Sequence, residues 1–282
     1  MSVGRAAAGR ARVRFSLLLP VAIFGVLAVS LVAQVPRERY RGSNIVVGEG
    51  PADRSAFTVC RLAYTQVRRE EGGSGWDTEL VIADQNLMFR LADFTNMAVL
   101  RHENGTPAQV AVRATDEALF ACPFLVASDP GSAGFDPTEV ERLREYLLKG
   151  GFLWADDFWG ERALDHWLGE IGRVLPEYET FEVTSDHPLM SAFYFVDAVP
   201  QIPNIRFWRS TGGQTSERGF ESAVPRAYAI ADEHDRILVF MTHNTDIADG
   251  WEREGEDFGF FHSFSPYAYA LAVNVVVAAM TR

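Results

Sequence analysis

Two adjacent acidic residues, Asp156 and Asp157, follow the apolar run 152–155, which has the composition of a buried strand. In open parallel sheets, ligands bind outside the carboxyl ends of the strands. Two carboxylates at this place can hold a metal ion, act as general acid and base, or bind sugar hydroxyls. The structural alternative is that Asp157 caps the next helix while Asp156 accepts hydrogen bonds from loop N–H groups.

A histidine beside a carboxylate, His187 after Asp186, is the second candidate for chemistry. Such a pair can serve as a base and the group that orients it, whereas Pro188 makes a simple loop turn the alternative. The candidate catalytic residues are therefore Asp156, Asp157 and His187.

Two further predicted strands are each followed by a polar loop, and these loops supply candidates for ligand binding. The candidate binding residues are Ser128, Trp159, His243, Asn244, Asp246 and Trp251. His243 and Asp246 are of types that ligate metals, as are Asp156 and His187. Nothing in the sequence spacing shows that these four residues meet, so we expect no metal ion and no cofactor.

The elements that must position these residues follow an α/β pattern. The strand candidates 124–127 and 152–155 enclose a helix, which begins at the capping sequence 136–139 and ends at the glycine pair 150–151. Asp at the N-cap, Pro at the first helical position and Glu at the third form a strong helix start. The strand–helix–strand order predicts a right-handed crossover and a parallel sheet.

Weaker patterns complete the predicted fold. They are a helix capped by Asp84, a helix over 164–171, strands at 57–63, 181–183 and 205–208, a hairpin of 226–231 with 237–241, and a last helix from Ser265 to Met280. The last helix is apolar nearly all round and too short to span a bilayer, so we expect it to pack inside the fold. The fold class is α/β: three layers, a mostly parallel sheet, and one transmembrane helix before it.

The hairpin decides whether the polar loops share one edge of the sheet. One of its strands must run antiparallel to the rest, and we predict that this strand is 226–231. Ser128, Asp157 and His243 would then face a common groove, with Trp159 near its rim.

Both cysteines, Cys60 and Cys122, lie in apolar runs. Unpaired cysteine is among the most buried residue types, so we expect two buried free thiols. A disulfide is the alternative, and it requires an oxidising compartment and two neighbouring strands.

Composition excludes some partners. The 282 residues are 48% hydrophobic and 23% charged, with a net charge of −12. These values are typical of a globular chain, and an acidic surface repels nucleic acid. The glycine-rich stretch 72–75 lacks the spacing of a nucleotide-binding loop, so we expect no nucleotide ligand.

The run 15–33, FSLLLPVAIFGVLAVSLVA, carries no charge, and arginine is the only charged residue before it. Roughly 20 apolar residues span a bilayer as a helix, and the basic flank predicts a cytoplasmic N-terminus with the bulk of the chain in the periplasm. Cleavage of a signal peptide near Ala33, and hence secretion, is the alternative. The expected organisation is a basic N-terminus at 1–14, a membrane segment at 15–33, a linker at 34–55 and one folded domain at 56–282.

Short motifs occur in a recognisable order along the folded part. They are Trp76–Thr78, Asp84–Leu87, Pro123–Leu125, Tyr146–Leu153, Ala155–Phe158, Asp186–Pro188, Asn244–Ile247, Gly250-Trp251 and Asn274–Val277. Their order and spacing resemble the bacterial domain of unknown function DUF4159 over nearly all of 57–282. The resemblance implies a Rossmann-like sheet similar to class I glutamine amidotransferases, a place in the cell envelope, and no established activity.

Amidotransferase chemistry needs a cysteine on a sharp turn after a strand, next to a histidine. Here Ser128-Asp129 occupies the turn after 124–127, and Cys122 lies before that strand. We therefore expect a non-catalytic binding or assembly module with an envelope protein or glycan as partner. The alternative is a hydrolase of an envelope substrate that acts through Asp156, Asp157 and His187. The missing nucleophile elbow favours the first reading.

Overall fold

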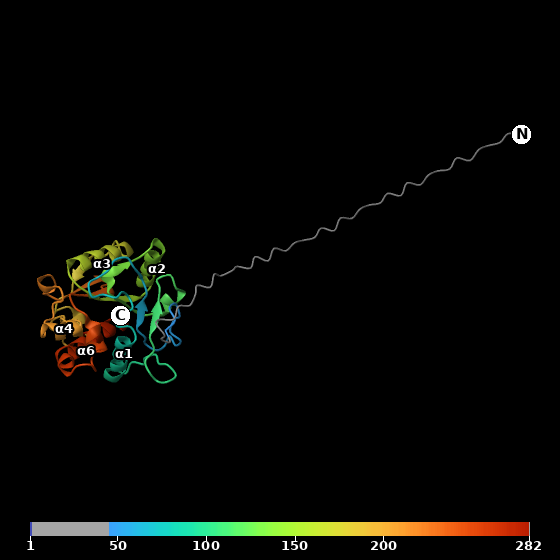
Figure 1. Ribbon diagram of the computed structural model, residues 1–282. Coiled ribbons are helices and arrows are strands. Elements are labelled where there is room, and N and C mark those ends of the chain that lie inside the picture. The colour runs from blue at the N-terminus through green and yellow to red at the C-terminus, as the bar shows by residue number, and fades with distance from the viewer. Residues whose placement is uncertain (2–44, 282) are drawn as a thin grey trace. The chain divides into compact units, whose positions relative to one another are not determined.

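The computed structural model describes Met1 and residues 45–281 (Figure 1). The expected membrane segment at 15–33 lies outside the described residues. Part of the expected linker is described and packs on the domain, because Ile45 and Val47 are buried against Ala63, Leu80 and Ala111.

A seven-stranded sheet runs through the described part of the chain. In spatial order its strands are β3 (Val110–Val112), β1 (Cys60–Leu62), β4 (Phe124–Ser128), β6 (Phe152–Phe158), β9 (Ile237–His243), β8 (Arg226–Ala231) and β7 (Thr180–Glu182). The five strands from β3 to β9 are parallel, whereas β8 is antiparallel to both β9 and β7. The predicted hairpin and its predicted antiparallel strand, 226–231, are therefore confirmed.

Helices cover both faces of this sheet, as Figure 1 shows with α2 and α3 on one side and α1 and α6 on the other. Their bounds are α1 (Ile82–Phe94), α2 (Pro137–Leu148), α3 (Glu161–Val174), α4 (Ile205–Thr211), α5 (Ile247–Glu252) and α6 (Phe258–Met280). Successive side chains of a strand point to opposite faces. In β4, Phe124 and Val126 pack in the core with α1, α5 and α6, and Leu125 and Ala127 pack in the core with α2 and α3. The chain is thus a mixed α/β domain with a mostly parallel sheet.

The unit of β4, α2 and β6 forms as predicted. Asp136 accepts hydrogen bonds from the N–H groups of Thr138 and Glu139, and the Glu139 side chain accepts one from Asp136 N–H, which completes a capping box. The remaining short elements are β2 (Thr65–Gln66), β5 (Ala133–Gly134), and the 3₁₀ turns η1 (Glu117–Ala121), η2 (Pro130–Ser132), η3 (Pro188–Ser191) and η4 (Gly219–Ser222).

Two predicted elements are wrong in type or start. Residues 205–208, expected as a strand, begin α4, because the Asn204 side chain caps the helix by accepting a hydrogen bond of 3.0 Å from Arg206 N–H. The last helix starts at Phe258 rather than at Ser265, with Asp257 as its N-cap and Pro266 inside it. At both places the cap that forms, Asn204 for α4 and Asp257 for α6, differs from what the sequence indicated.

Helix α6 is also the one described helix that is long and apolar enough to cross a membrane. Most of its apolar window, 61%, is buried inside the domain, and residues such as Phe260, Leu271 and Val275 belong to the core. The expectation that this helix is too short to span a bilayer is therefore wrong, because it begins before Ser265. The prediction that it packs inside the fold is confirmed, and this packing accounts for its composition.

The two cysteines do not remain free thiols. Cys60 and Cys122 form a disulfide, with their Cα atoms 5.9 Å apart. Cys60 lies in β1, and Cys122 lies just before β4, the strand paired with β1. Adjacent parallel strands bring together two cysteines that are 62 residues apart in sequence.

We predict that the double variant Cys60→Ala/Cys122→Ala is about 2–4 kcal/mol less stable than the oxidised protein, because a disulfide removes conformational freedom from the unfolded chain. Urea unfolding followed by circular dichroism measures the difference. A reducing agent should lower the stability of the native protein and leave the double variant unchanged. Equal stability of the two proteins without reductant would contradict the prediction.

Candidate functional site

The carboxyl ends of β4, β6 and β9 meet at one edge of the sheet. Ser128 pairs with Asp156 across β4 and β6, and Phe158 pairs with His243 across β6 and β9. The chain leaves β1 towards β3 on one side and then continues through β4, β6 and β9 on the other. The direction in which successive strands are added to the sheet therefore reverses between β1 and β4. Such a topological switch point is where open α/β sheets bind ligands.

A small cavity of about 30 Å³ lies at this edge, and we call it the strand-end cavity. The acidic residues that line it are Glu70, Glu71, Glu79, Asp129, Asp157, Glu217 and Asp246. One water molecule needs about 10–15 Å³, so the cavity has room for one or two small groups. A wider loop groove of about 880 Å³ shares Glu79 and Glu217 with the cavity, and its walls come mainly from 71–80, 204–207 and 252–253.

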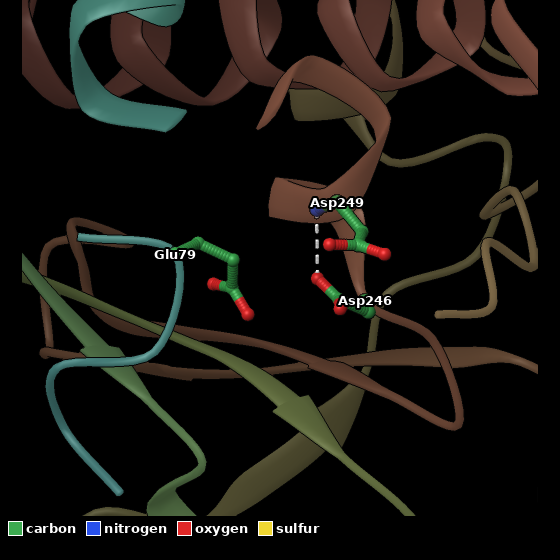
Figure 2. A group of neighbouring side chains, drawn as sticks. All are labelled: Glu79, Asp246 and Asp249. Atoms are coloured by element: carbon green, nitrogen blue, oxygen red, sulfur yellow. Dashed lines mark hydrogen bonds between the residues drawn. The ribbon is translucent and has the colours of Figure 1, made fainter. Parts of the chain in front are cut away.

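The carboxylates reach the cavity from several parts of the fold. Asp129 follows β4, Asp157 lies near the end of β6, and Asp246 is the N-cap of α5 directly after β9. Glu79 comes from the loop before α1. Figure 2 shows the carboxylates of Glu79, Asp246 and Asp249 turned towards one another, with ligand atoms within 4.8 Å of each other. The N–H of Asp249 donates to Asp246 over 2.8 Å.

The backbone around the cavity is held in unfavourable conformations. Glu79, Asp129 and Asp157 have φ angles of 54°, 48° and 60°, in the left-handed region that disfavours side chains. Each such residue costs on the order of 1 kcal/mol and persists only where its surroundings fix it. Strained residues of this kind gather at functional sites, and here all three line one cavity.

The glycine-rich loop 72–75 explains how Asp129 is held. Gly75 N–H donates to Asp129 Oδ2 over 2.8 Å. A Cβ atom at Gly73 would lie 2.4 Å from the same oxygen, so only glycine lets the loop approach the carboxylate so closely. The loop therefore positions Asp129 at the strand-end cavity.

A buried arginine, Arg61, stabilises the elements that carry the site. Arg61 in β1 is 1% exposed and donates from Nε and Nη2 to Asp84, at 2.9 and 2.7 Å. It also donates to the hydroxyl of Ser128, and its Nη1 lies 3.9 Å from Glu79. Asp84, expected to be the N-cap of α1, therefore lies inside the first turn as the partner of a buried charge.

Negative charge exceeds positive charge in the cavity. Burial and, to a lesser degree, the charge of Glu70 raise the pKa of Asp129 to about 7. Burial and the charges of Glu79 and Asp129 hold the pKa of Asp157 well above its usual range. Burial, Glu79 and Asp157 do the same for Asp246. Among the described residues, none forms an ion pair within 4.0 Å with Asp129, Asp157 or Asp246.

Three of the sequence candidates line the strand-end cavity: Asp157, Trp159 and Asp246. Trp159 is 6% exposed, and its indole N–H donates to Asp157 Oδ1 over 3.1 Å. Asp157 does not cap α3, whose N-cap is Gly160. Trp159 thus positions a carboxylate rather than offering a stacking face.

The other acidic candidate, Asp156, has a structural role. It is fully buried, and its oxygens accept hydrogen bonds from the Thr242 hydroxyl and from Ala248 N–H. The carboxylate thus joins β6 to β9 and to α5.

Ser128 and His243 do not face the cavity, so the expected common groove of Ser128, Asp157 and His243 is wrong for two of its three members. Arg61 donates to the Ser128 hydroxyl, and the Tyr64 hydroxyl donates to the Ser128 carbonyl oxygen. The ring of His243 packs on Phe158, with centroids 5.0 Å apart, and its Nε2 lies 3.0 Å from the Gly160 carbonyl oxygen. Burial lowers the pKa of His243.

The remaining candidates also lie away from the cavity lining. His187 precedes η3 and accepts a hydrogen bond from Leu189 N–H over 3.2 Å through Nδ1. Asn244 accepts from Gly160 N–H over 2.8 Å. Trp251 packs in the core, with its ring centroid 5.7 Å from that of Trp154. The four residues considered above as a metal set do not form a cluster in the structure.

Sequence reasoning missed several cavity residues. Asp129 carried a usable signal, because it directly follows Ser128 at a predicted strand end. Glu79 and Glu217 carried none, since they come from loops whose approach to the sheet edge depends on tertiary packing.

The raised pKa of Asp129 predicts that the domain loses stability as pH rises. Between about pH 4 and pH 7, Asp129 in the folded state keeps a proton that it has released in the unfolded chain. The stabilisation that this proton gives is therefore complete below about pH 4 and is lost as the pH rises through about 7. For each proton retained in this way, the free energy of unfolding falls by about 1.4 kcal/mol for every unit by which the pH rises in this range. Urea unfolding in EDTA buffer from pH 5 to pH 8 measures the slope.

Asp129→Asn should make that slope shallower, whereas Asp165→Asn on the exposed surface of α3 should leave it unchanged. A native protein that is equally stable at pH 5 and pH 8 would show the prediction to be wrong.

Comparison with known proteins agrees with the resemblance seen in the motifs. The family model described as "Domain of unknown function (DUF4159)" matches residues 59–280, from β1 through α6. A search of curated proteins gives no match. Because the family match covers most of the chain, including every element that lines the strand-end cavity, this protein belongs to the DUF4159 family.

Proposed function

We propose that this protein is a non-catalytic binding module of the cell envelope and that the loop groove holds its ligand. The carrying observation is the groove itself: a wide polar surface at the carboxyl edge of the sheet, lined by both carboxylates and arginines. Such an edge is where α/β sheets place ligands.

The placement of the nucleophilic and basic side chains favours binding over the hydrolase alternative. No histidine or cysteine of the described residues lines the cavity or the groove. Both oxygens of Asp156 are used by backbone and hydroxyl donors. His187 lies at η3 and does not join Asp157, so the three residues of the hydrolase hypothesis do not form one set.

The chemistry of the groove favours a hydroxyl-rich ligand such as an envelope glycan. Glu71 accepts hydrogen bonds and Arg206 donates them, which suits sugar hydroxyls that do both. Protein interfaces, in contrast, have an apolar core. In this domain the apolar surface pocket lies between α1 and α6, lined by Phe94, Tyr194 and Tyr269.

A finer fold assignment, a Rossmann-like domain similar to class I glutamine amidotransferases, belongs to the same proposal. Five adjacent parallel strands with helices on both faces support it. The turn after β4, where the amidotransferase nucleophile is expected, carries Ser128-Asp129, and both cysteines are in a disulfide. A related sheet without the nucleophile agrees with a binding role.

An N-terminal anchor that holds the domain outside the cytoplasm completes the proposal. The uncharged run 15–33 with its basic flank supports it. The Cys60–Cys122 disulfide also supports it, because disulfides persist in oxidising compartments. Release after cleavage near Ala33 is the alternative.

For topology, we expect a reporter fused after Arg282 to be active when it requires export and inactive when it requires the cytoplasm. The full-length mass should remain in the membrane fraction if 15–33 is an anchor. Deletion of 15–33 is the control and should reverse both reporters. Activity of the cytoplasmic reporter in the native fusion would refute the topology, and a shortened soluble product would identify cleavage.

For ligand binding, we expect the purified full chain in detergent to bind isolated cell-wall glycan and soluble glycan fragments. The variant Glu71→Gln/Arg206→Gln should bind at least tenfold more weakly, because it removes one acceptor and one donor from the groove. The variant Arg162→Gln/Asp165→Asn makes the same charge changes on the exposed surface of α3 and should bind normally. Calorimetry gives the dissociation constants.

Unchanged binding by the groove variant would place the glycan elsewhere and refute the proposal. Capture from an envelope fraction that disappears after protease treatment of that fraction would identify a protein partner instead.

A further inference from the structure

Three carboxylates have the spacing of ligands around one ion, and two of them, Glu79 and Asp246, line the strand-end cavity. The oxygens of Glu79, Asp246 and Asp249 lie within 4.8 Å of one another (Figure 2). Calcium binds oxygen at about 2.3–2.6 Å, so two of its ligands lie at most about 5 Å apart. A single cation between the three side chains would contact all of them.

A separate observation points to a missing partner in the same cavity. Asp129 is 1% exposed and lines the cavity, yet its Oδ1 atom accepts no hydrogen bond from any described residue. Its other oxygen is used by Gly75 N–H. A buried carboxylate oxygen without a donor is costly, and native structures rarely leave one unexplained.

Hydrogen bonds from neighbouring groups orient the proposed ligand carboxylates and still leave lone pairs on their oxygens. Asp249 accepts from Ile205 N–H over 3.0 Å and from Arg253 Nε over 3.4 Å, through different oxygens. Asp246 accepts from Asp249 N–H through one of its two oxygens. Such outer contacts fix a carboxylate's direction and leave lone pairs for a metal.

The donor chemistry and the size of the cavity select the ligand class. Carboxylate oxygens without histidine or cysteine suit hard cations rather than zinc or copper. A volume of about 30 Å³ admits an ion and a water molecule.

We infer that the strand-end cavity binds one hard divalent cation, Ca²⁺ or Mg²⁺, through the carboxylates of Glu79, Asp246 and Asp249. Asp129 and Asp157 face the same cavity and supply further oxygens to the ion or to its water molecules. The site requires no glycan, so its test is independent of the proposed function.

The test uses the full chain in detergent, stripped with EDTA and titrated at pH 8 by calorimetry with CaCl₂ and, separately, with MgCl₂. We expect one cation per chain and a rise in the unfolding temperature with it. Tighter binding of Ca²⁺ would indicate ligation mainly by carboxylates, and tighter binding of Mg²⁺ would indicate an ion that keeps water molecules; either result supports the site.

The variant Asp246→Asn shows whether Asp246 is a metal ligand or has only a structural role. Asparagine still caps α5 but removes one charge, so the cation-free variant should be at least as stable as the native protein while its cation affinity falls at least tenfold. Glu79→Gln, in a loop, is the second variant with the same expectation. Asp165→Asn is the charge-matched control and should bind as the native protein does.

Absence of binding heat and of any temperature shift with millimolar Ca²⁺ or Mg²⁺, in protein that is folded by circular dichroism, would overturn the inference. It would mean that protons alone neutralise the cavity. Native affinity in both Asp246→Asn and Glu79→Gln would also overturn it, because the ion would then bind elsewhere.

Discussion

The buried guanidinium of Arg61 is the interaction on which the strand-end region depends. From one side chain in β1 it reaches Asp84 in α1, the hydroxyl of Ser128 in β4 and the Thr78 carbonyl oxygen in the loop before α1. Burial alone would lower the pKa of Arg61, but the charges of Asp84 and Glu79 outweigh it and raise the pKa. An unpaired charge here would cost several kcal/mol, so the pair with Asp84 fixes where α1 and its preceding loop lie. Glu79 reaches the cavity because of that placement.

One buried arginine cannot balance the carboxylates that this arrangement gathers. Asp129, Asp157 and Asp246 reach the cavity from three strand ends, and none has a basic partner within 4.0 Å among the described residues. Two of them, with Glu79, also hold left-handed backbone conformations. Repulsion between the carboxylates and strain in the backbone both reduce the stability of the domain. A purely structural role for these residues explains neither cost, because neutral side chains would fill that role as well. A fold that concentrates these costs at the switch point of its sheet has the properties of a ligand site.

The sequence predicted those features that local patterns decide. The Asp136 capping box, the strands on either side of α2 and the 226–241 hairpin depend on neighbouring residues, and all three are confirmed. One local feature was missed, because residues 205–208 have a strand-like composition and yet Asn204 caps a helix there. Features decided by tertiary contacts were missed as well. The Cys60–Cys122 disulfide is one of them, since it depends on which strands are adjacent. In the site, the rule that ligands bind at the carboxyl ends of parallel strands pointed to Asp157 and Asp246, which line the cavity. It could not show which way His243 points, nor that the loop carrying Glu79 folds over the sheet edge.

The cavity and the loop groove are physically coupled, because Glu79 and Glu217 belong to both. Where they are ionised, Glu79 and Asp157 repel any ligand that brings negative charge to the groove, whereas neutral hydroxyls can still hydrogen-bond there. A divalent ion at Glu79 would offset two of the cavity's charges and draw the loop before α1 towards α5. Ligand choice in the groove would then depend on the ion below it. Calcium sites of extracellular modules typically bind in the range of about 10⁻⁴–10⁻³ M. If the proposed location outside the cytoplasm holds, the inferred site needs to reach only an affinity of that order.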